Sequence, residues 1–228
     1  MLTDFHCHIL PGIDDGAKIA EISAEMIEML QSQGVERIAA TPHFFAHKEK
    51  SVERFLEKRQ YSYDKLKASG TSVENIFPGA EISIEKGISE LKGIEKLAIE
   101  GTNIILLEFP YSGFSEWMPE EIHNISCEFG LMPMIAHLNR YISIFSKKEM
   151  EIVLGMKAIF QFNNGAFSSF REKKFFGKII KSDKEFAFGS DSHNTDLRKP
   201  NFDLLKKTFK KKPEIIESSN NIFDKYIK

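Results

Sequence analysis

Apolar and polar positions along this chain of 228 residues follow two periods. Short continuous apolar runs are typical of buried strands, whereas apolar residues three and four positions apart indicate amphipathic helices. The apolar runs predict strands at residues 2–6, 35–40, 73–79, 103–109, 131–137, 158–162 and 186–189. The helical spacing predicts helices at residues 19–33, 52–68, 88–100, 116–129, 147–155, 175–182, 202–209 and 213–227.

Strands and helices therefore alternate along most of the chain, which favours parallel strands joined by helical crossovers and an α/β fold. No linker rich in glycine, serine or proline divides the sequence, so we expect a single domain over residues 1–228. A closed or nearly closed barrel fits better than an open doubly wound sheet, because polar residues collect directly after the strands. The open sheet remains the alternative architecture.

Composition narrows the class of protein. The formal net charge of −2 gives no overall attraction to nucleic acid or to anionic membranes. Two cysteines, Cys7 and Cys127, do not support a disulfide framework. The sequence has neither an apolar run of the ~20 residues that a membrane span needs nor a signal peptide at its start. We therefore expect a cytoplasmic protein without membrane insertion, and we interpret the lysine-rich stretch at 206–212 as a solvated helix face.

Potential metal ligands follow almost every predicted strand. Histidine, aspartate and glutamate supply the nitrogen and oxygen ligands that divalent metals use. Residues two apart in an extended strand point to the same side, so His6 and His8 can hold one ion together. Acid or imidazole groups directly after an apolar run are costly to bury unless they are paired or bound to metal. The strand-end residues are His6, His8, His43, Glu81, Glu108, His137, Asp191 and His193.

Each of these residues has an ordinary structural interpretation when taken alone, such as capping a helix or forming a hydrogen bond. We assign His47 and His123 to that class and leave them out of the set. Cys7 lies between two expected ligands on the opposite strand face, where burial as a small apolar residue is expected. Neither cysteine has an arginine six residues later, so covalent thiol phosphatase chemistry is not expected.

Five motifs resemble the polymerase-and-histidinol-phosphatase (PHP) superfamily. Within it, the chain is similar to the manganese-dependent bacterial tyrosine phosphatases of capsule and exopolysaccharide synthesis. The motifs are HCHILPGIDDG at 6–16, ATPH at 40–43, GAE at 79–81, HLNRY at 137–141 and SDSHN at 190–194. The His-x-His opening alone is weak, because amidohydrolases share it. The extended opening with the other four motifs in order is specific.

This resemblance implies a distorted (β/α)7 TIM-like barrel with a site for three divalent metal ions. It implies one ion on His6, His8, Glu81 and Asp191, a second on Glu81, Glu108 and His137, and a third on Asp15, His43 and His193. The broader superfamily often has histidine where this chain has Asp15 and Glu108, and the capsule subfamily has acids there. Manganese is the expected metal, with iron, zinc and magnesium as alternatives.

The resemblance also implies hydrolysis of phosphotyrosine on a protein, with the tail of a polysaccharide-synthesis tyrosine kinase as the expected partner. We expect direct in-line attack by metal-bound hydroxide, without a phosphoenzyme. Arg140 and Arg198 are the candidates for neutralising phosphate charge. Asp15, His43 or His193 of the third site is expected to protonate the leaving group. Six aromatic residues are candidates for flanking the phenyl ring, namely Phe44, Phe45, Tyr111, Phe114, Trp117 and Tyr141.

Three alternatives remain open at this level. The first is a phosphatase for histidinol phosphate or another small phosphomonoester. The second is a non-catalytic regulator that keeps the metal scaffold and binds a kinase tail. The third is a metal-dependent amidohydrolase, which normally uses a lysine ligand on a strand, and no lysine stands at a matching strand end. The oligomeric state stays undetermined.

The first expected ligand pair gives a direct test. We expect His6→Ala to lose metal and activity together, because His6 is assigned to the ion at the end of the first strand. Elemental analysis of the purified variant and turnover of para-nitrophenyl phosphate measure the two effects. A variant that keeps its full metal content would remove His6 from the ligand set.

Overall fold

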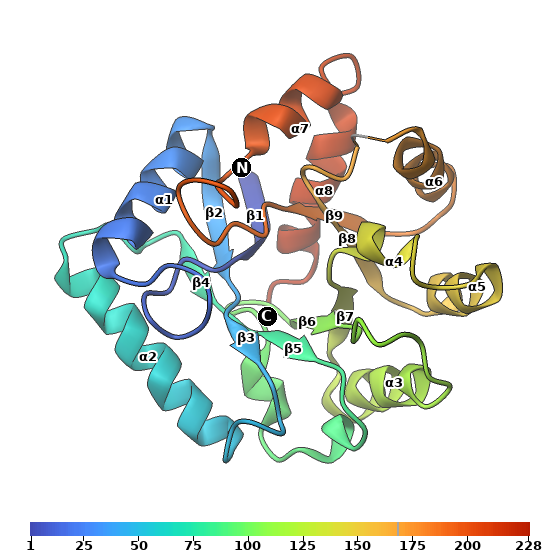
Figure 1. Ribbon diagram of the computed structural model, residues 1–228, viewed down its shortest axis with the longest axis horizontal. Coiled ribbons are helices and arrows are strands. Elements are labelled where there is room, and N and C mark those ends of the chain that lie inside the picture. Colours follow the sequence, from blue (N-terminus) through green and yellow to red (C-terminus); the bar gives the residue numbers. More distant parts are fainter. Residues whose placement is uncertain (168) are drawn as a thin grey trace.

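The computed structural model describes residues 1–167 and 169–228 and has an α/β fold (Figure 1). The strands lie at the centre and helices surround them. The strands are β1 (Leu2–Cys7), β2 (Val35–Ala40), β3 (His43–Phe44), β4 (Ile76–Pro78), β5 (Glu81–Ser83), β6 (Ile104–Glu108), β7 (Met132–Ile135), β8 (Ile159–Asn163) and β9 (Phe186–Gly189). The helices are α1 (Ala20–Ser32), α2 (Val52–Ala68), α3 (Met118–Phe129), α4 (Leu138–Tyr141), α5 (Lys147–Gly155), α6 (Phe170–Ile180), α7 (Phe202–Thr208) and α8 (Glu214–Lys225).

All paired strands are parallel, as the alternation predicts. They form two sheets, with the orders β1-β2-β4 and β3-β5-β6-β7-β8-β9. The prediction of a closed barrel is therefore not confirmed, because the described residues form no closed sheet. None of the helices in the described part of the chain is both long and apolar enough to cross a membrane.

The structure has two more strands than the sequence pattern predicts, because the short strands β3 and β5 follow the ends of the second and third predicted strands. The second strand stops at Ala40 and resumes as β3 at His43, because Pro42 has no N–H to donate to a sheet ladder. The third strand is shorter than expected and is interrupted at Gly79 and Ala80, before β5. These interruptions separate the two sheets and turn His43 and Glu81 into paired neighbours, residue opposite residue.

The predicted helix over residues 88–100 is wrong. Two short 3-10 turns, Ile88–Glu90 and Ile94–Leu97, take its place. Gly87 and Gly93 precede these turns with φ angles of 83° and 84°, a left-handed conformation that breaks a continuous helix. Helix α6 begins earlier than expected, because Ser169 and Glu172 form a capping box at its start.

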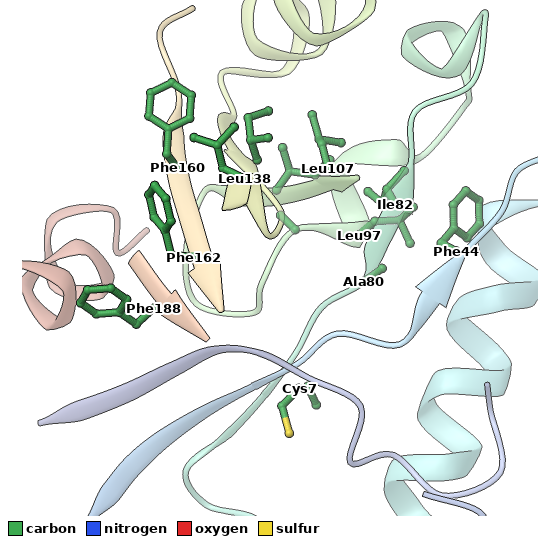
Figure 2. Close-up of a cluster of buried hydrophobic side chains, with 14 of the residues drawn as sticks. Cys7, Phe44, Ala80, Ile82, Leu97, Leu107, Leu138, Phe160, Phe162 and Phe188 are labelled. Atoms are coloured by element: carbon green, nitrogen blue, oxygen red, sulfur yellow. The ribbon is translucent and has the colours of Figure 1, made fainter. Parts of the chain in front are cut away.

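Strand alternation sorts the core into an inner and an outer cluster. Ile104 and Leu106 of β6 belong to an inner cluster covered by Ile222 and Phe223 of α8. The intervening Leu107 packs outward with Phe160 and Phe162, which extend from the same face of β8 in Figure 2. Full burial of each such side chain contributes about 1.5–3 kcal/mol. Because side chains repeat every second residue, Glu108 follows Leu106 on the inner side, directly above an apolar layer.

The first and last strands meet beside the inner cluster. Cys7 and Ser192 form an isolated parallel bridge, and the Asp191 N–H donates to the His6 carbonyl oxygen at 2.7 Å. The buried Asp4 carboxylate accepts hydrogen bonds from the backbone N–H and the hydroxyl of Ser190. This seam brings residues nearly the whole chain apart into contact, and it places His6 beside Asp191.

The seam requires glycine at position 189. A Cβ added there would lie 2.6 Å from the His6 Cβ and 2.9 Å from the Gln161 Nε2. We expect Gly189→Ala to lower the free energy of unfolding by about 1–3 kcal/mol, because overpacking displaces neighbouring groups. Urea unfolding measures this change.

Gly155→Ala is the matched control, because an added Cβ at the end of α5 meets nothing within 4 Å. We expect it to stabilise the protein by up to about 1 kcal/mol, since alanine suits a helix better than glycine. Equal effects of the two substitutions would show that the seam is not tightly packed.

Candidate metal centre

Nine acidic and imidazole side chains converge at the carboxyl ends of the strands. His6 and His8 come from β1 and its end, His43 from β3, and Glu81 from β5. Glu108, His137, Asp191 and His193 come from β6 and from the ends of β7 and β9, and Asp15 comes from the loop after β1. Eight of the nine are buried or half-buried, and the Asp15 side chain is 61% exposed. The structure thus brings together every residue in the expected metal-binding set.

Glu81 lies at the middle of this cluster. Its Oε2 atom is 3.1 Å from His6 Nε2, 3.2 Å from His8 Nε2 and 3.0 Å from His43 Nδ1. Its other oxygen, Oε1, is 2.8 Å from His137 Nε2. The side chain is 1% exposed, so four imidazoles take the place of water around one carboxylate. Such a buried group needs cations or protons between its neighbours.

The donor geometry fits metal ions better than hydrogen bonds. His6 Nε2 and His8 Nε2 are 3.1 Å apart. Two nitrogens on one ion with bonds of about 2.0–2.1 Å also lie roughly 3 Å apart. Four buried atoms of the cluster lack a hydrogen-bond partner among the described residues, namely Glu81 Oε2, His43 Nδ1, His137 Nδ1 and His193 Nε2. The residues present therefore fit divalent cations.

Three groups of ligand atoms are close enough for one ion each. They are His8, Asp15, His43 and His193; His6, His8 and Glu81; and His43, Glu81 and Glu108. Within each group, the ligand atoms lie within 4.8 Å of one another. These groups partly match the expected assignment of ligands to three ions. They differ in that His8 and His43 each belong to two groups. Asp191 Oδ1 is 3.7 Å from the Nε2 atoms of His6 and His8, and Glu108 Oε1 is 3.1 Å from His137 Nε2.

Proton affinities in the cluster are strongly perturbed. Burial alone would lower the pKa of His8, but its hydrogen bond to Asp14 and the nearby negative charge of Glu81 raise it to about 10. Burial and the nearby His8 lower the pKa of His193 to about 4. Burial opposes ionisation of Asp191, yet its cationic neighbours, His6 foremost, lower its pKa to about 2. In the absence of metal, protons balance the buried carboxylates, and metal ions would displace such protons on binding.

A second layer of side chains orients the histidines, and the sequence interpretation missed it. Asp14 Oδ2 is 2.7 Å from His8 Nδ1 and accepts a hydrogen bond from the His43 N–H. Gln161 Oε1 is 3.2 Å from His6 Nδ1 and accepts from the His137 N–H at 2.5 Å. Such partners fix imidazole orientation and tune ligand basicity. Gln161 had a detectable signal, because it interrupts the apolar run of β8 and a buried amide needs partners.

Two members of the cluster have left-handed backbone conformations. His137 has φ 30° and Asp191 has φ 50°, and they are the only non-glycine residues in the described chain with positive φ. Such conformations cost of order 1–3 kcal/mol and occur preferentially at functional sites. Each lies two positions after the last residue of a strand, so the backbone turns sharply where the side chain enters the cluster.

Two arginines border the cluster. Arg140 Nη2 donates to Asp191 Oδ2, and Arg198 Nη2 donates to Asp191 Oδ1 at 2.9 Å. Arg198 Nη1 is also 3.6 Å from Asp15 Oδ2. Tyr111, which is 54% exposed, accepts a hydrogen bond from Arg140 through its hydroxyl group. The guanidinium groups thus lie between the buried ligands and solvent, where an anion can reach them.

The histidines and cysteines left out of the expected ligand set have other contacts or are buried. His47 pairs with Glu85, and the exposed Cys127 contacts His123. Cys7 is fully buried, and burial raises the pKa of its thiol. These contacts and the burial of Cys7 account for His47, His123 and Cys7 without a metal.

The six aromatic candidates divide by position. Phe44 and Tyr141 are buried in the core, and Phe114 and Trp117 pack against it. Phe45 stacks on His43 with ring centroids 5.4 Å apart, and Tyr111 stacks on His137 at 6.4 Å. The buried Tyr141 also lies against His137, with tilted rings whose centroids are 5.7 Å apart. Phe45 and Tyr111 are therefore the two candidates that stack on cluster histidines without being fully buried.

The comparisons with known proteins agree on one family. The model for the family described as "Capsular polysaccharide synthesis, CpsB/CapC" matches residues 2–224. Tyrosine-protein phosphatase CpsB of Streptococcus pneumoniae is 30% identical over 219 residues, which cover 87% of this chain and 86% of that protein. Tyrosine-protein phosphatase YwqE of Bacillus subtilis is 27% identical over 202 residues, which cover 86% of this chain and 79% of that protein.

A solved structure supports the same fold. It comes from a study of YwqE from Bacillus subtilis and CpsB from Streptococcus pneumoniae, described there as unique metal-dependent tyrosine phosphatases. It matches with a TM-score of 0.79 and 23% sequence identity, covering 97% of this chain and 92% of the other. The arrangement of strands and helices is thus shared along almost the whole chain.

The arginines give a test that separates anion binding from metal binding. We expect Arg140→Ala to keep its metal content and to lower kcat/KM for a phosphate monoester about 10- to 100-fold, the effect of one or two charged hydrogen bonds. Steady-state kinetics and elemental analysis measure these effects. Arg54→Ala, on the exposed face of α2, is the matched control and is expected to change neither. Unchanged kinetics in Arg140→Ala would exclude the arginine from anion binding.

Proposed function

Because the chain belongs to the capsular polysaccharide synthesis CpsB/CapC family, we propose that it is a metal-dependent protein-tyrosine phosphatase. One observation carries this proposal, namely the buried cluster of histidines and carboxylates with two arginines at its rim. Buried imidazoles and carboxylates suit divalent cations, and guanidinium groups suit phosphate. The cluster and its rim therefore match a phosphate ester substrate.

We propose that three divalent ions bind here, with manganese as the expected metal and iron, zinc or magnesium as alternatives. The residues that would hold them are His6, His8, Asp15, His43, Glu81, Glu108, His137, Asp191 and His193. Bound divalent ions would activate water and neutralise charge on the phosphoryl group. Both oxygens of Glu81 could serve as ligands, because they face different histidines.

The protein's own groups would perform the remaining tasks. Arg140 and Arg198 bind and orient the phosphoryl group, and their present partner Asp191 keeps both guanidinium groups at the rim. Asp14 and Gln161 hold the His8 and His6 imidazoles in fixed orientations. Asp15, His43 or His193 supplies the proton to the leaving phenolate, because these groups lie on the side of the cluster where Asp15 is exposed. Cys7 is not expected to act as a nucleophile, since its thiol is fully buried and burial raises its pKa.

The substrate would be phosphotyrosine on a protein, with the tail of a capsule-synthesis tyrosine kinase as the partner. Phe45 and Tyr111 are suited to flank the phenyl ring, because both stack on histidines of the cluster and neither is fully buried. We further propose that the chain acts as one domain in the cytoplasm, where reducing conditions keep its two cysteines as free thiols.

A side-by-side assay tests the proposed substrate class. We expect manganese-loaded protein to turn over a phosphotyrosine peptide faster than histidinol phosphate. Prior removal of metal with a chelator is expected to abolish the activity, and added manganese is expected to restore it. Release of inorganic phosphate measures each reaction.

Three outcomes would contradict the proposal in different ways. Faster turnover of histidinol phosphate would indicate a small-molecule phosphatase. Absence of turnover of para-nitrophenyl phosphate by metal-loaded protein would indicate a non-catalytic regulator. Full activity after complete metal removal would exclude metal-dependent hydrolysis. The His6→Ala variant provides the background rate for all these assays.

A further inference from the structure

A second concave site lies away from the metal centre, between α6, α7 and the start of α8. These helices lie together at one edge of the molecule (Figure 1). The cavity has a volume of about 530 Å³, within the range of about 300–1,000 Å³ typical of ligand sites. None of the residues that line it belongs to the metal-centre cluster. We call this site the basic groove and define it by its five lysines, which are Lys173, Lys207, Lys210, Lys211 and Lys212.

The charge of the basic groove is one-sided. Five of its twelve lining residues are lysines, and none is acidic. All five lysines are exposed, and none forms an ion pair within the part of the chain that the structure describes. The whole chain carries a formal net charge of −2, so this concentration of positive charge is local. An anionic partner is the complementary ligand.

Helix stability does not account for all of these lysines. A lysine near the C-terminal end of a helix interacts favourably with the helix dipole, and Lys207 and Lys210 are in that position at the end of α7. Lys211 and Lys212 come directly before Pro213 at the start of α8, where positive charge near a helix N-terminus is unfavourable. Two of the lysines thus stand where the local backbone disfavours them.

The floor of the basic groove is apolar. Phe176 and Phe209 lie at its base with ring centroids 5.6 Å apart, and Phe167 and Ile215 complete it. Ile180 at the edge is 39% exposed. Phe176 and Phe167 are recessed, at 2% and 6% exposed, so they cannot insert into a bilayer. A side chain from a partner must instead enter the cavity, which favours a peptide over a membrane surface.

A glycine keeps the cavity open. Gly177 stands in the middle of α6, where glycine costs about 0.5–1 kcal/mol relative to alanine. A Cβ added at Gly177 would meet nothing within 4 Å, so packing does not require glycine there. Gly177 lines the cavity, and any larger side chain would occupy its space. The sequence thus gives up helix stability at the position where a side chain would close the groove.

We propose that the basic groove binds an acidic peptide segment of a partner protein that inserts one apolar side chain between the lysines. The lysines would pair with the carboxylates of the segment, and the phenylalanine floor would bury the inserted side chain. This proposal does not depend on the phosphatase activity, because the basic groove shares no residue with the metal centre.

The test measures binding to the full chain without turnover. The probe is a fluorescein-labelled peptide of glutamates with one central phenylalanine, and fluorescence anisotropy reports its binding. We expect binding to weaken with added salt, because exposed charge pairs are screened. A second peptide has serine in place of the phenylalanine and is expected to bind about tenfold more weakly, since the apolar burial is lost.

Two variants locate the site. Gly177→Leu fills the cavity and is expected to weaken binding about tenfold while raising the midpoint of thermal unfolding. Joint replacement of Lys207, Lys210 and Lys211 by alanine is expected to weaken binding by a similar factor. The matched control replaces Lys67, Lys92 and Lys148, which are exposed lysines outside the basic groove, and should leave binding within about twofold.

Each binding result either supports or contradicts peptide binding at the basic groove. Weakened binding in both groove variants but not in the control supports the proposal. Equal binding of the two peptides would show charge attraction without an anchor site and would overturn it. Binding of phosphatidylserine vesicles, with no binding of either peptide, would assign the surface to membranes and would also overturn it. Unchanged para-nitrophenyl phosphate turnover in the groove variants separates this result from any failure of the proposed function.

Discussion

The buried carboxylate of Glu81, surrounded by four imidazoles, is the constraint on which the rest of the site depends. One negative charge removed from water is costly unless positive charge lies nearby. His6, His8, His43 and His137 provide its neighbours, and they come from three different parts of the chain. The protein therefore has to bring the ends of β1, β3, β5 and β7 to one point. Parallel strands meet this requirement, because their carboxyl ends lie on one side.

Asp191 performs the equivalent task at the rim. It contacts the inner histidines through one oxygen and the outer arginines through both, so it connects the buried cluster with the side facing solvent. Its backbone is strained, and the seam between the first and last strands holds it in place. Asp4, Ser190 and Gly189 build that seam from small and hydrogen-bonded groups. The geometry of the rim thus depends on packing two residues below it.

The two surfaces of functional interest use charge in opposite ways. The candidate metal centre concentrates carboxylates and imidazoles that could hold cations, whereas the basic groove concentrates lysines around an apolar floor. They share no residue, so the proposed chemistry at one and the proposed docking at the other can be tested separately. A fold with helices outside its strands permits this separation, since the strand ends build one site and the outer helices build the other.

The sequence by itself determined the α/β class and identified the residues that converge at the strand ends, because strand periodicity and strand-end residues are local features. His6-x-His8, or Glu108 after an apolar run, can be identified without coordinates. Tertiary structure decided which of two adjacent acids orients His8, since Asp14 and Asp15 look alike in sequence and face different partners. It also decided the sheet interruptions and the basic groove. Lys173 and Lys207 are far apart in the chain, and only the packing of α6 against α7 and α8 brings them to one cavity.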